Sequence, residues 1–248
     1  MRRRALLCLG AAAVLSAALP VAGPAAELGE CAVPPEMLDL PARLRYLAQA
    51  IRDKAPARII VIGGSSTRGA AAGPVENAYP HRLQLALQAL FPDVPITVIN
   101  QGMPRQTARQ MLERFPADTS AEHPVLVVWE VGISDAVRGI DLGEFATTLQ
   151  AGIDLAKDRA FDILLVDMQF SRRAAMVIDF ERYLNAIHHI GGLNDVYVFP
   201  RFAIMRHWSE ENMFNFDDVA EGERARLAAK VYDCIGRTLA EAFRNAVR

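Results

Sequence analysis

The residues best suited to chemistry are the hydroxyl side chains that follow an apolar run between Arg58 and Gly63. The run has the length and composition of a buried strand, and Gly63 and Gly64 end it in a tight turn. A turn at the carboxyl end of a parallel strand exposes a side chain in the crevice where open α/β sheets bind ligands. Ser65, the first residue after the two glycines, is therefore the candidate nucleophile.

A serine hydroxyl becomes nucleophilic when a neighbouring base removes its proton, so the histidines matter. The chain contains five of them: His81, His123, His188, His189 and His207. His207 lies in an irregular stretch, residues 201–218, that follows the fifth apolar run and contains several carboxylates able to orient an imidazole. We predict His207 as the general base, and the alternative is a loop histidine packed beside Trp208. His188 and His189 are interpreted as a solvated or capping pair on a helix.

Apolar runs of strand length alternate with segments of helical periodicity. The expected strands are residues 58–63, 96–100, 125–131, 163–168 and 196–199, and the expected helices are 40–54, 81–91, 107–115, 142–159, 176–189 and 221–247. Alternation with short connections predicts a parallel sheet covered by helices on both faces. No repeat or linker interrupts the pattern, so one domain is expected over residues 27–248.

The amino-terminal residues have the layout of a secretory signal peptide. Arg2, Arg3 and Arg4 precede an apolar stretch and then small residues, which predicts a leader over residues 1–26 and a periplasmic or secreted protein. A membrane anchor is the alternative, but Pro20 interrupts the stretch, so no stable membrane insertion is expected after cleavage. The net charge of −2 provides no basic surface for nucleic acid.

Two cysteines, Cys31 and Cys234, remain after removal of the leader. An exported protein permits a disulfide, and we predict one between these two residues, with two buried thiols as the alternative. Metal-ligand spacings, a dinucleotide-binding motif and a phosphate-binding loop are absent from the sequence, so neither a metal nor a cofactor is expected.

The segment Gly63-Gly64-Ser65-Ser66-Thr67 resembles the first motif of the SGNH or GDSL ester hydrolases, Gly-Asp-Ser-x-Thr, with the aspartate missing. The resemblance implies that the backbone N–H of Gly102, after the second strand, contributes to an oxyanion hole. It also implies a second oxyanion donor from the motif Gly-x-Asn-Asp, where this chain has Ser134 in place of the asparagine. The serine hydroxyl can donate one hydrogen bond, but the serine side chain is shorter than the asparagine side chain that it replaces.

The fourth motif of that family, Asp-x-x-His, has no match. One placement falls on residues 214–217 and the other on Glu223-Arg224-Ala225-Arg226, and neither contains a histidine. The resemblance also implies a three-layer α/β/α sandwich, flavodoxin-like, whose five parallel strands are ordered 2-1-3-4-5.

The leading functional hypothesis is an exported SGNH-type hydrolase that cleaves a carboxylic ester through an acyl-enzyme on Ser65. Its expected substrate is a small acyl ester or an acylated envelope glycan. The alternatives are a catalytically impaired relative that binds a glycan or acyl ligand, and an O-acyltransferase. No feature of the sequence indicates an oligomeric state.

Overall fold

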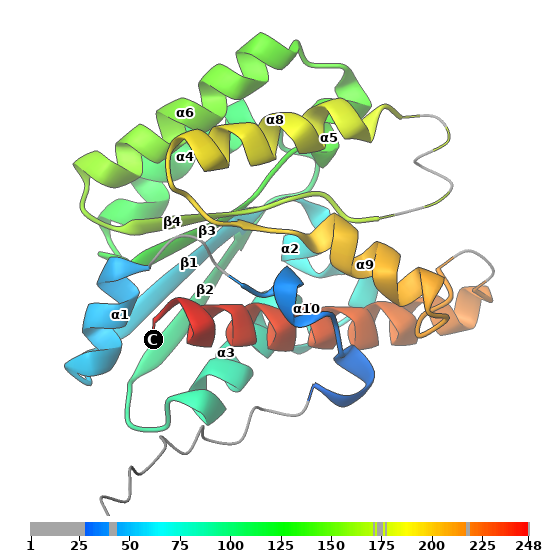
Figure 1. The fold of residues 1–248 in the computed structure, drawn as a ribbon, viewed down its shortest axis with the longest axis horizontal. Helices are drawn as coiled ribbons and strands as arrows, with labels where there is room; N and C mark the ends of the chain where they lie inside the picture. Colours follow the sequence, from blue (N-terminus) through cyan, green and yellow to red (C-terminus); the bar gives the residue numbers. More distant parts are fainter. Residues whose placement is uncertain are drawn as a thin grey trace, which may run out of the picture.

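The computed structural model describes residues 28–39, 44–170, 172, 176, 178–216 and 219–247, so the predicted signal peptide lies outside the described residues. Five parallel strands form one sheet in the order β2-β1-β3-β4-β5, which confirms the expected order (Figure 1). They are β1 (Ala57–Gly63), β2 (Ile96–Gly102), β3 (Leu126–Glu130), β4 (Asp162–Val166) and β5 (Val198–Phe199).

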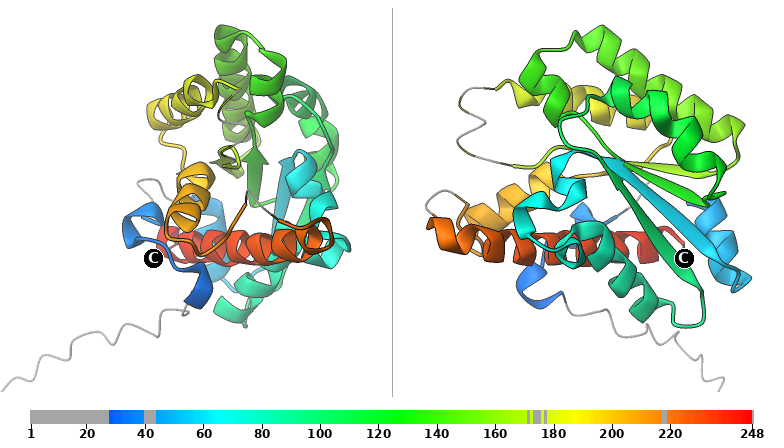
Figure 2. Two further views of the ribbon diagram at one scale, coloured as in Figure 1. Left: turned by 90° about the vertical axis from the view of Figure 1, so that its right-hand side faces the viewer. Right: turned by 180° about the vertical axis from the view of Figure 1, so that it is seen from behind.

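Helices cover both faces of the sheet, as Figures 1 and 2 show from three sides, and the three-layer prediction is confirmed. One core joins the sheet to α1 (Arg45–Arg52), α3 (Tyr79–Leu90), α9 (Arg201–Glu210) and α10 (Arg224–Ala246). The other joins it to α4 (Ala108–Ser120), α6 (Leu142–Asp158) and α8 (Phe180–Leu193). Two short helices, α2 (Ser65–Arg68) and α5 (Ile133–Arg138), directly follow β1 and β3.

The alternation of side chains along each strand explains why both faces are buried. In β1, Ile59 and Val61 belong to one core, whereas Ile60 and Ile62 belong to the other, and all four are fully buried. A strand buried on both faces reads as a continuous apolar run, as this one does in the sequence.

Helix α9 replaces part of the irregular stretch that we expected over residues 201–218. Its buried side chains include Ile204, Met205 and Trp208, at the spacing of one helical face. Arg201 occupies the first position of the same face and is also buried, so a charged residue interrupts the apolar pattern from which a helix is predicted. The prediction of a loop around His207 was wrong, because that residue lies within this helix.

The predicted disulfide between Cys31 and Cys234 is confirmed, with Cα atoms 5.0 Å apart. It joins the segment before α1 to the middle of α10, which are separated by 203 residues. Cross-links that close such long loops restrict the unfolded chain most strongly.

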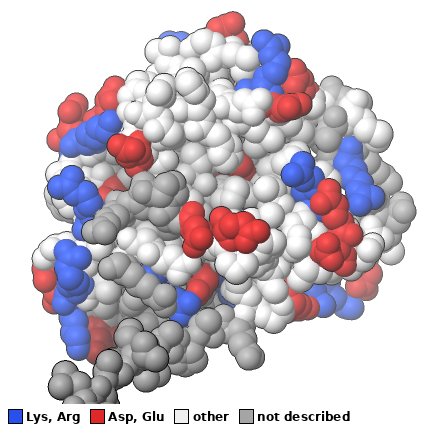
Figure 3. Space-filling view, viewed as in Figure 1, with Lys and Arg blue, Asp and Glu red and all other residues white. Residues whose placement is uncertain are grey.

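Acidic and basic side chains are interspersed on the face of the molecule seen in Figure 3, and neither sign forms an extended patch there. Among the described helices, none combines the length and the apolar character needed to cross a membrane.

Candidate active site

Ser65 lies at the start of α2, immediately after β1 and Gly64, and its side chain is exposed. Its hydroxyl forms no hydrogen bond with the described residues, whereas the next two hydroxyls point into the protein. Ser66 Oγ donates to Glu130 Oε1 at 2.5 Å and Thr67 Oγ1 donates to Glu130 Oε2 at 2.5 Å. The turn therefore presents one hydroxyl to the outside and anchors the other two beneath it.

Glu130, at the end of β3, is the centre of a buried polar cluster that supports α2. We define this cluster as Glu130, Arg201, Ser66, Thr67 and Tyr79. Arg201 is fully buried; its Nη1 lies 3.3 Å from Glu130 Oε2 and donates to Ser66 Oγ at 3.0 Å. The Tyr79 hydroxyl lies 3.0 Å from Thr67 Oγ1, and burial, together with the charge of Glu130, raises the pKa of Tyr79 well above its usual value.

The end of β2 fixes α2 from the other side. Asn100 Nδ2 donates to the carbonyl oxygen of Thr67 at 2.8 Å, and Asn100 Oδ1 accepts from the backbone N–H of Gly102 at 2.9 Å. A Cβ atom on Gly102 would lie 2.3 Å from the backbone nitrogen of Arg68, so only glycine allows β2 and α2 to approach this closely. The N–H of Gly102 already has an acceptor, and its predicted oxyanion role finds no support in this geometry.

Ser65 and Ser134 line the same cavity, which has a volume of about 410 Å³. Arg105 and Arg138 line it too, together with Gln169, while Gly102 is not among its lining residues. The structure thus brings together the predicted nucleophile and the predicted side-chain oxyanion donor. It adds two arginines that the sequence motifs did not indicate.

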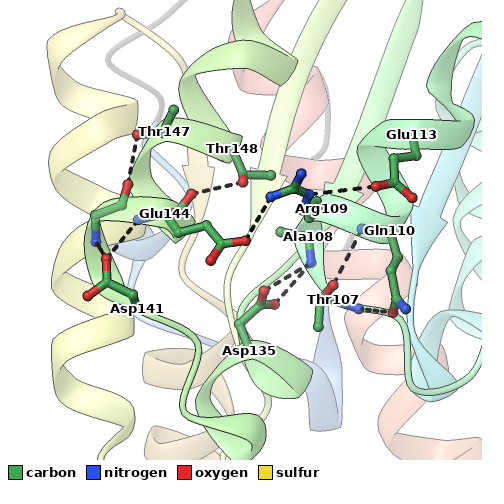
Figure 4. Close-up of polar contacts among 11 residues, drawn as sticks. Thr107, Ala108, Arg109, Gln110, Glu113, Asp135, Asp141, Glu144, Thr147 and Thr148 are labelled. Carbon is green, nitrogen blue, oxygen red and sulfur yellow. Dashed lines mark hydrogen bonds and ion pairs between the residues drawn. The ribbon is translucent and has the colours of Figure 1, made fainter.

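Asp135, the last residue of the motif that contains Ser134, holds the start of α4, which follows the loop of Arg105 in the chain (Figure 4). Both of its carboxylate oxygens accept from the backbone N–H of Ala108 at 3.1 Å, and burial raises the pKa of Asp135 above its usual value. Arg105 has a positive φ of 63°, which is uncommon for residues other than glycine, and its carbonyl oxygen accepts from Arg138 Nη2 at 2.6 Å. The loop is therefore tied to α5 at two points.

His207 does not line the cavity of Ser65, and neither does any other of the five histidines, all of which are described. The residue lies near the end of α9, is half-buried, and makes no described contact with Ser65. The proposed pairing of His207 with Ser65 therefore finds no support in the described part of the chain.

A histidine and aspartate pair exists elsewhere, and sequence reasoning missed it. His188 Nε2 lies 2.9 Å from Oδ2 of Asp167, the residue that follows β4, so His188 is partly solvated, as interpreted, but also has a buried carboxylate partner that was not foreseen. Asp167 Oδ1 also accepts from the backbone N–H of Phe202 at 2.8 Å. Burial raises the pKa of Asp167, while His188 opposes the shift. This pair lines a separate cavity of about 570 Å³ that does not include Ser65.

One of the two placements of the missing Asp-x-x-His motif lies at the start of α10. Glu223 Oε2 and Arg226 Nη1 are 3.0 Å apart there, and both side chains are mostly exposed. They line a different cavity from Ser65. An arginine cannot act as a base near neutral pH, because its pKa exceeds about 12.

Comparisons with known proteins agree with the fold. A variant of an acetyl xylan esterase from Geobacillus stearothermophilus matches with a TM-score of 0.61 and 19% identity, covering 77% of this chain and 96% of that one. A two-domain esterase active on acetylated mannans matches with a TM-score of 0.63 and 16% identity, covering 84% of this chain and 57% of that one.

A relative with detectable sequence similarity is an arylesterase from Vibrio mimicus, 27% identical over 133 residues. The match covers 54% of this chain and 65% of the arylesterase, which is less than two thirds of that protein's length. The sequence model of the non-GDSL lipase-like family matches residues 30–248. Because this match spans most of the chain, the protein belongs to the non-GDSL lipase-like family, built on the SGNH hydrolase fold.

Proposed function

We propose that the protein cleaves a small carboxylic ester, such as an O-acetyl group on a glycan, and that Ser65 takes up the acyl group. The exposed hydroxyl of Ser65, in a cavity of about 410 Å³ at the carboxyl end of the sheet, carries the proposal. Support comes from the buried cluster around Glu130, which fixes the turn, because a nucleophile must be held rigidly to attack productively.

The chemistry of the acyl transfer follows from that position. The oxygen of Ser65 would attack the ester carbonyl carbon, and the alcohol would leave with a proton as the acyl-enzyme forms. Water would then hydrolyse the acyl-enzyme and regenerate the hydroxyl. Ser134 can donate its hydroxyl hydrogen to the oxyanion of the tetrahedral intermediate, because it lines the same cavity.

A second candidate function, binding of an acylated ligand without turnover, is favoured by a specific observation. No histidine lines the cavity of Ser65, and Glu223 and Arg226 occupy one placement of the missing Asp-x-x-His motif. General acid and base catalysis contributes roughly 10²–10⁴-fold to such reactions, so an enzyme without it should turn over slowly. Interception of the acyl-enzyme by a sugar hydroxyl would make the protein an O-acyltransferase.

Labelling with a fluorophosphonate probe tests the proposal, because the probe reports a nucleophilic serine whatever the substrate. We expect the protein without residues 1–26 to be labelled and to hydrolyse 4-nitrophenyl acetate, and Ser65→Ala to lose both activities. Ser66→Ala tests the neighbouring serine, whose hydroxyl is bonded to Glu130 and Arg201 and supports the turn, so labelling should weaken without being lost. Loss of labelling in Ser66→Ala but not in Ser65→Ala would show that Ser66 is the nucleophile and that our assignment is wrong. Absence of labelling in the unmodified protein would favour ligand binding without turnover.

Ser134→Asn provides an independent measurement on the same cavity. An amide donates from a longer side chain, so we expect the substitution to preserve or raise kcat for 4-nitrophenyl acetate. Ser134→Ala should lower kcat, by less than the roughly 10²–10³-fold known for loss of a strong oxyanion donor. Equal kcat values for all three proteins would exclude Ser134 from the reaction.

We also propose that the protein acts outside the cytoplasm. The amino-terminal leader pattern and the bond between Cys31 and Cys234 support this location, because disulfides persist in oxidising compartments. Fractionation of cells that express the full chain tests it; recovery of the uncleaved protein in the cytoplasm would refute it.

A further inference from the structure

The cavity of Ser65 is one half of a larger cleft. A second cavity, of about 440 Å³, lies against α9 and α10, and Ala71, Gln169 and Tyr232 line both. We call the two adjoining cavities the Ser65 cleft. The second cavity has several apolar walls, among them Phe170, Met205 and Leu227.

Among the described residues, the charged side chains that line the Ser65 cleft are all of one sign. Four arginines contribute to it, Arg105, Arg138, Arg201 and Arg224, and no aspartate or glutamate is found among the described residues that line it. The cavity beside His188 differs, since three carboxylates line it. A concave surface lined by one sign of charge raises the local concentration of ligands of the opposite sign.

The guanidinium group of Arg105 forms no ion pair or hydrogen bond with any described residue. Four residues further on, Arg109 has a very different environment: it interacts with Glu113 at 3.6 Å and with Glu144 at 3.1 Å (Figure 4). The backbone of Arg105 is held by Arg138, which donates to its carbonyl oxygen. An exposed, unpaired cation on a fixed backbone is therefore available to a ligand beside Ser65.

Arg201, which lines the second cavity, provides an independent observation. Its Nη1 is used by Ser66 and Glu130, but its Nε and Nη2 are buried and find no partner among the described residues. Buried N–H groups in proteins are nearly always hydrogen-bonded, so an acceptor such as a buried water is expected beside these two.

We propose that the Ser65 cleft selects ligands that carry a carboxylate, and that Arg105 determines this preference. That the ligand is also an ester rests on the proposed function. The binding of its carboxylate does not depend on that function. Guanidinium groups bind carboxylates through parallel N–H···O bonds, which a neutral ester group cannot form with the same strength.

Selectivity for an anionic ester tests the role of Arg105. The measured quantity is kcat/KM for 4-nitrophenyl hemisuccinate divided by that for neutral 4-nitrophenyl butyrate. We expect Arg105→Gly to lower this ratio by about fivefold, the upper range for one exposed ion pair. Glycine suits the positive φ at this position, so folding should not suffer.

Two further variants control for net charge. Arg105→Lys keeps the cation and should retain most of the ratio, and Arg109→Gln removes one positive charge outside the cleft and should leave the ratio unchanged. The ratio of the unmodified protein should also fall in about 0.5 M salt, because salt screens exposed charges. An identical ratio before and after Arg105→Gly would overturn the proposal.

Binding without chemistry separates this inference from the proposed function. Calorimetry on Ser65→Ala should detect glutarate and should detect its dimethyl ester more weakly. Glutarate binding that weakens in Arg105→Gly, together with no ester turnover by the unmodified protein, would refute the hydrolase and support the carboxylate site. Turnover of neutral esters without glutarate binding would support the hydrolase and overturn the carboxylate site.

Discussion

Two neighbouring strands end in buried carboxylates that hold the first turn of the same helix. Glu130, the last residue of β3, pairs with the side chain of Arg201, and Asp167, just after β4, accepts from the backbone N–H of Phe202. Both carboxylates are buried, and their helix partners are consecutive residues of α9. The same helix is thus fixed twice, by different kinds of interaction.

The two carboxylates differ in what neutralises them. Glu130 has a permanent cation and two hydroxyl donors, all buried. Asp167, whose own side chain is only 2% exposed, has a histidine partner whose side chain is 46% exposed, so water reaches the imidazole. A buried charge with a fixed counter-charge depends on that partner for its stability, whereas a carboxylate beside an exposed imidazole can adjust by gaining a proton. The first is the rigid support beneath Ser65, and the second is sensitive to pH.

The largest difference should appear when each carboxylate is replaced by its amide. Glu130→Gln removes the carboxylate that forms an ion pair with the buried Arg201, and we expect it to lower the free energy of unfolding by about 3–5 kcal/mol. Urea unfolding followed by circular dichroism measures the change. A loss below about 1 kcal/mol, the range of surface ion pairs, would show that Arg201 does not depend on Glu130.

A double replacement provides the control. Glu130→Leu combined with Arg201→Leu removes both charges. This double variant should recover a large part of the stability lost by Glu130→Gln. No recovery would indicate that Ser66 and Thr67, which would lose their acceptor, account for the loss instead of Arg201.

Asp167→Asn should be the milder of the two amide substitutions. The asparagine oxygen can still accept from the N–H of Phe202, and the exposed imidazole of His188 can turn to water. We therefore expect a loss of no more than about 3 kcal/mol at pH 7, the upper end of the range for a hydrogen bond to a charged group. A loss as large as that of Glu130→Gln, measured by the same urea titration, would contradict the distinction between the two carboxylates.

Much of the architecture could be predicted from local sequence signals. The apolar run before Gly63 and Gly64 specified β1 and the exposed turn at Ser65, because strand burial and glycine turns depend on adjacent residues. The disulfide could be predicted because only two cysteines follow the predicted leader. The strand order came from the resemblance to SGNH hydrolases and agrees with the structure.

The polar interactions around the site could not be predicted, because they join residues far apart in the chain. Arg201 donates to Ser66 across 135 positions, and a buried arginine in the first turn of α9 also obscured that helix. The pairing of Asp167 with His188 spans 21 positions and depends on how α8 packs beside β4. The only signal for it was an aspartate directly after an apolar run, which is typical of many strand ends.

The smallest predicted effect, the pH dependence of stability, distinguishes the two carboxylates most directly. Burial raises the pKa of Asp167 above its unfolded value of about 3.8, so the folded state binds this proton more tightly than the unfolded state. The stabilisation is fully present below about pH 3.8 and is lost as the pH rises through the raised pKa. A single proton limits the slope to about 1.4 kcal/mol per pH unit.

We expect the free energy of unfolding, measured in urea between pH 4 and 7, to fall with pH more steeply in the unmodified protein than in Asp167→Asn. His188→Gln should extend that fall to higher pH, because the imidazole opposes the rise in the pKa of Asp167. Identical pH profiles for the unmodified protein and Asp167→Asn would mean that Asp167 does not bind its proton more tightly in the folded state.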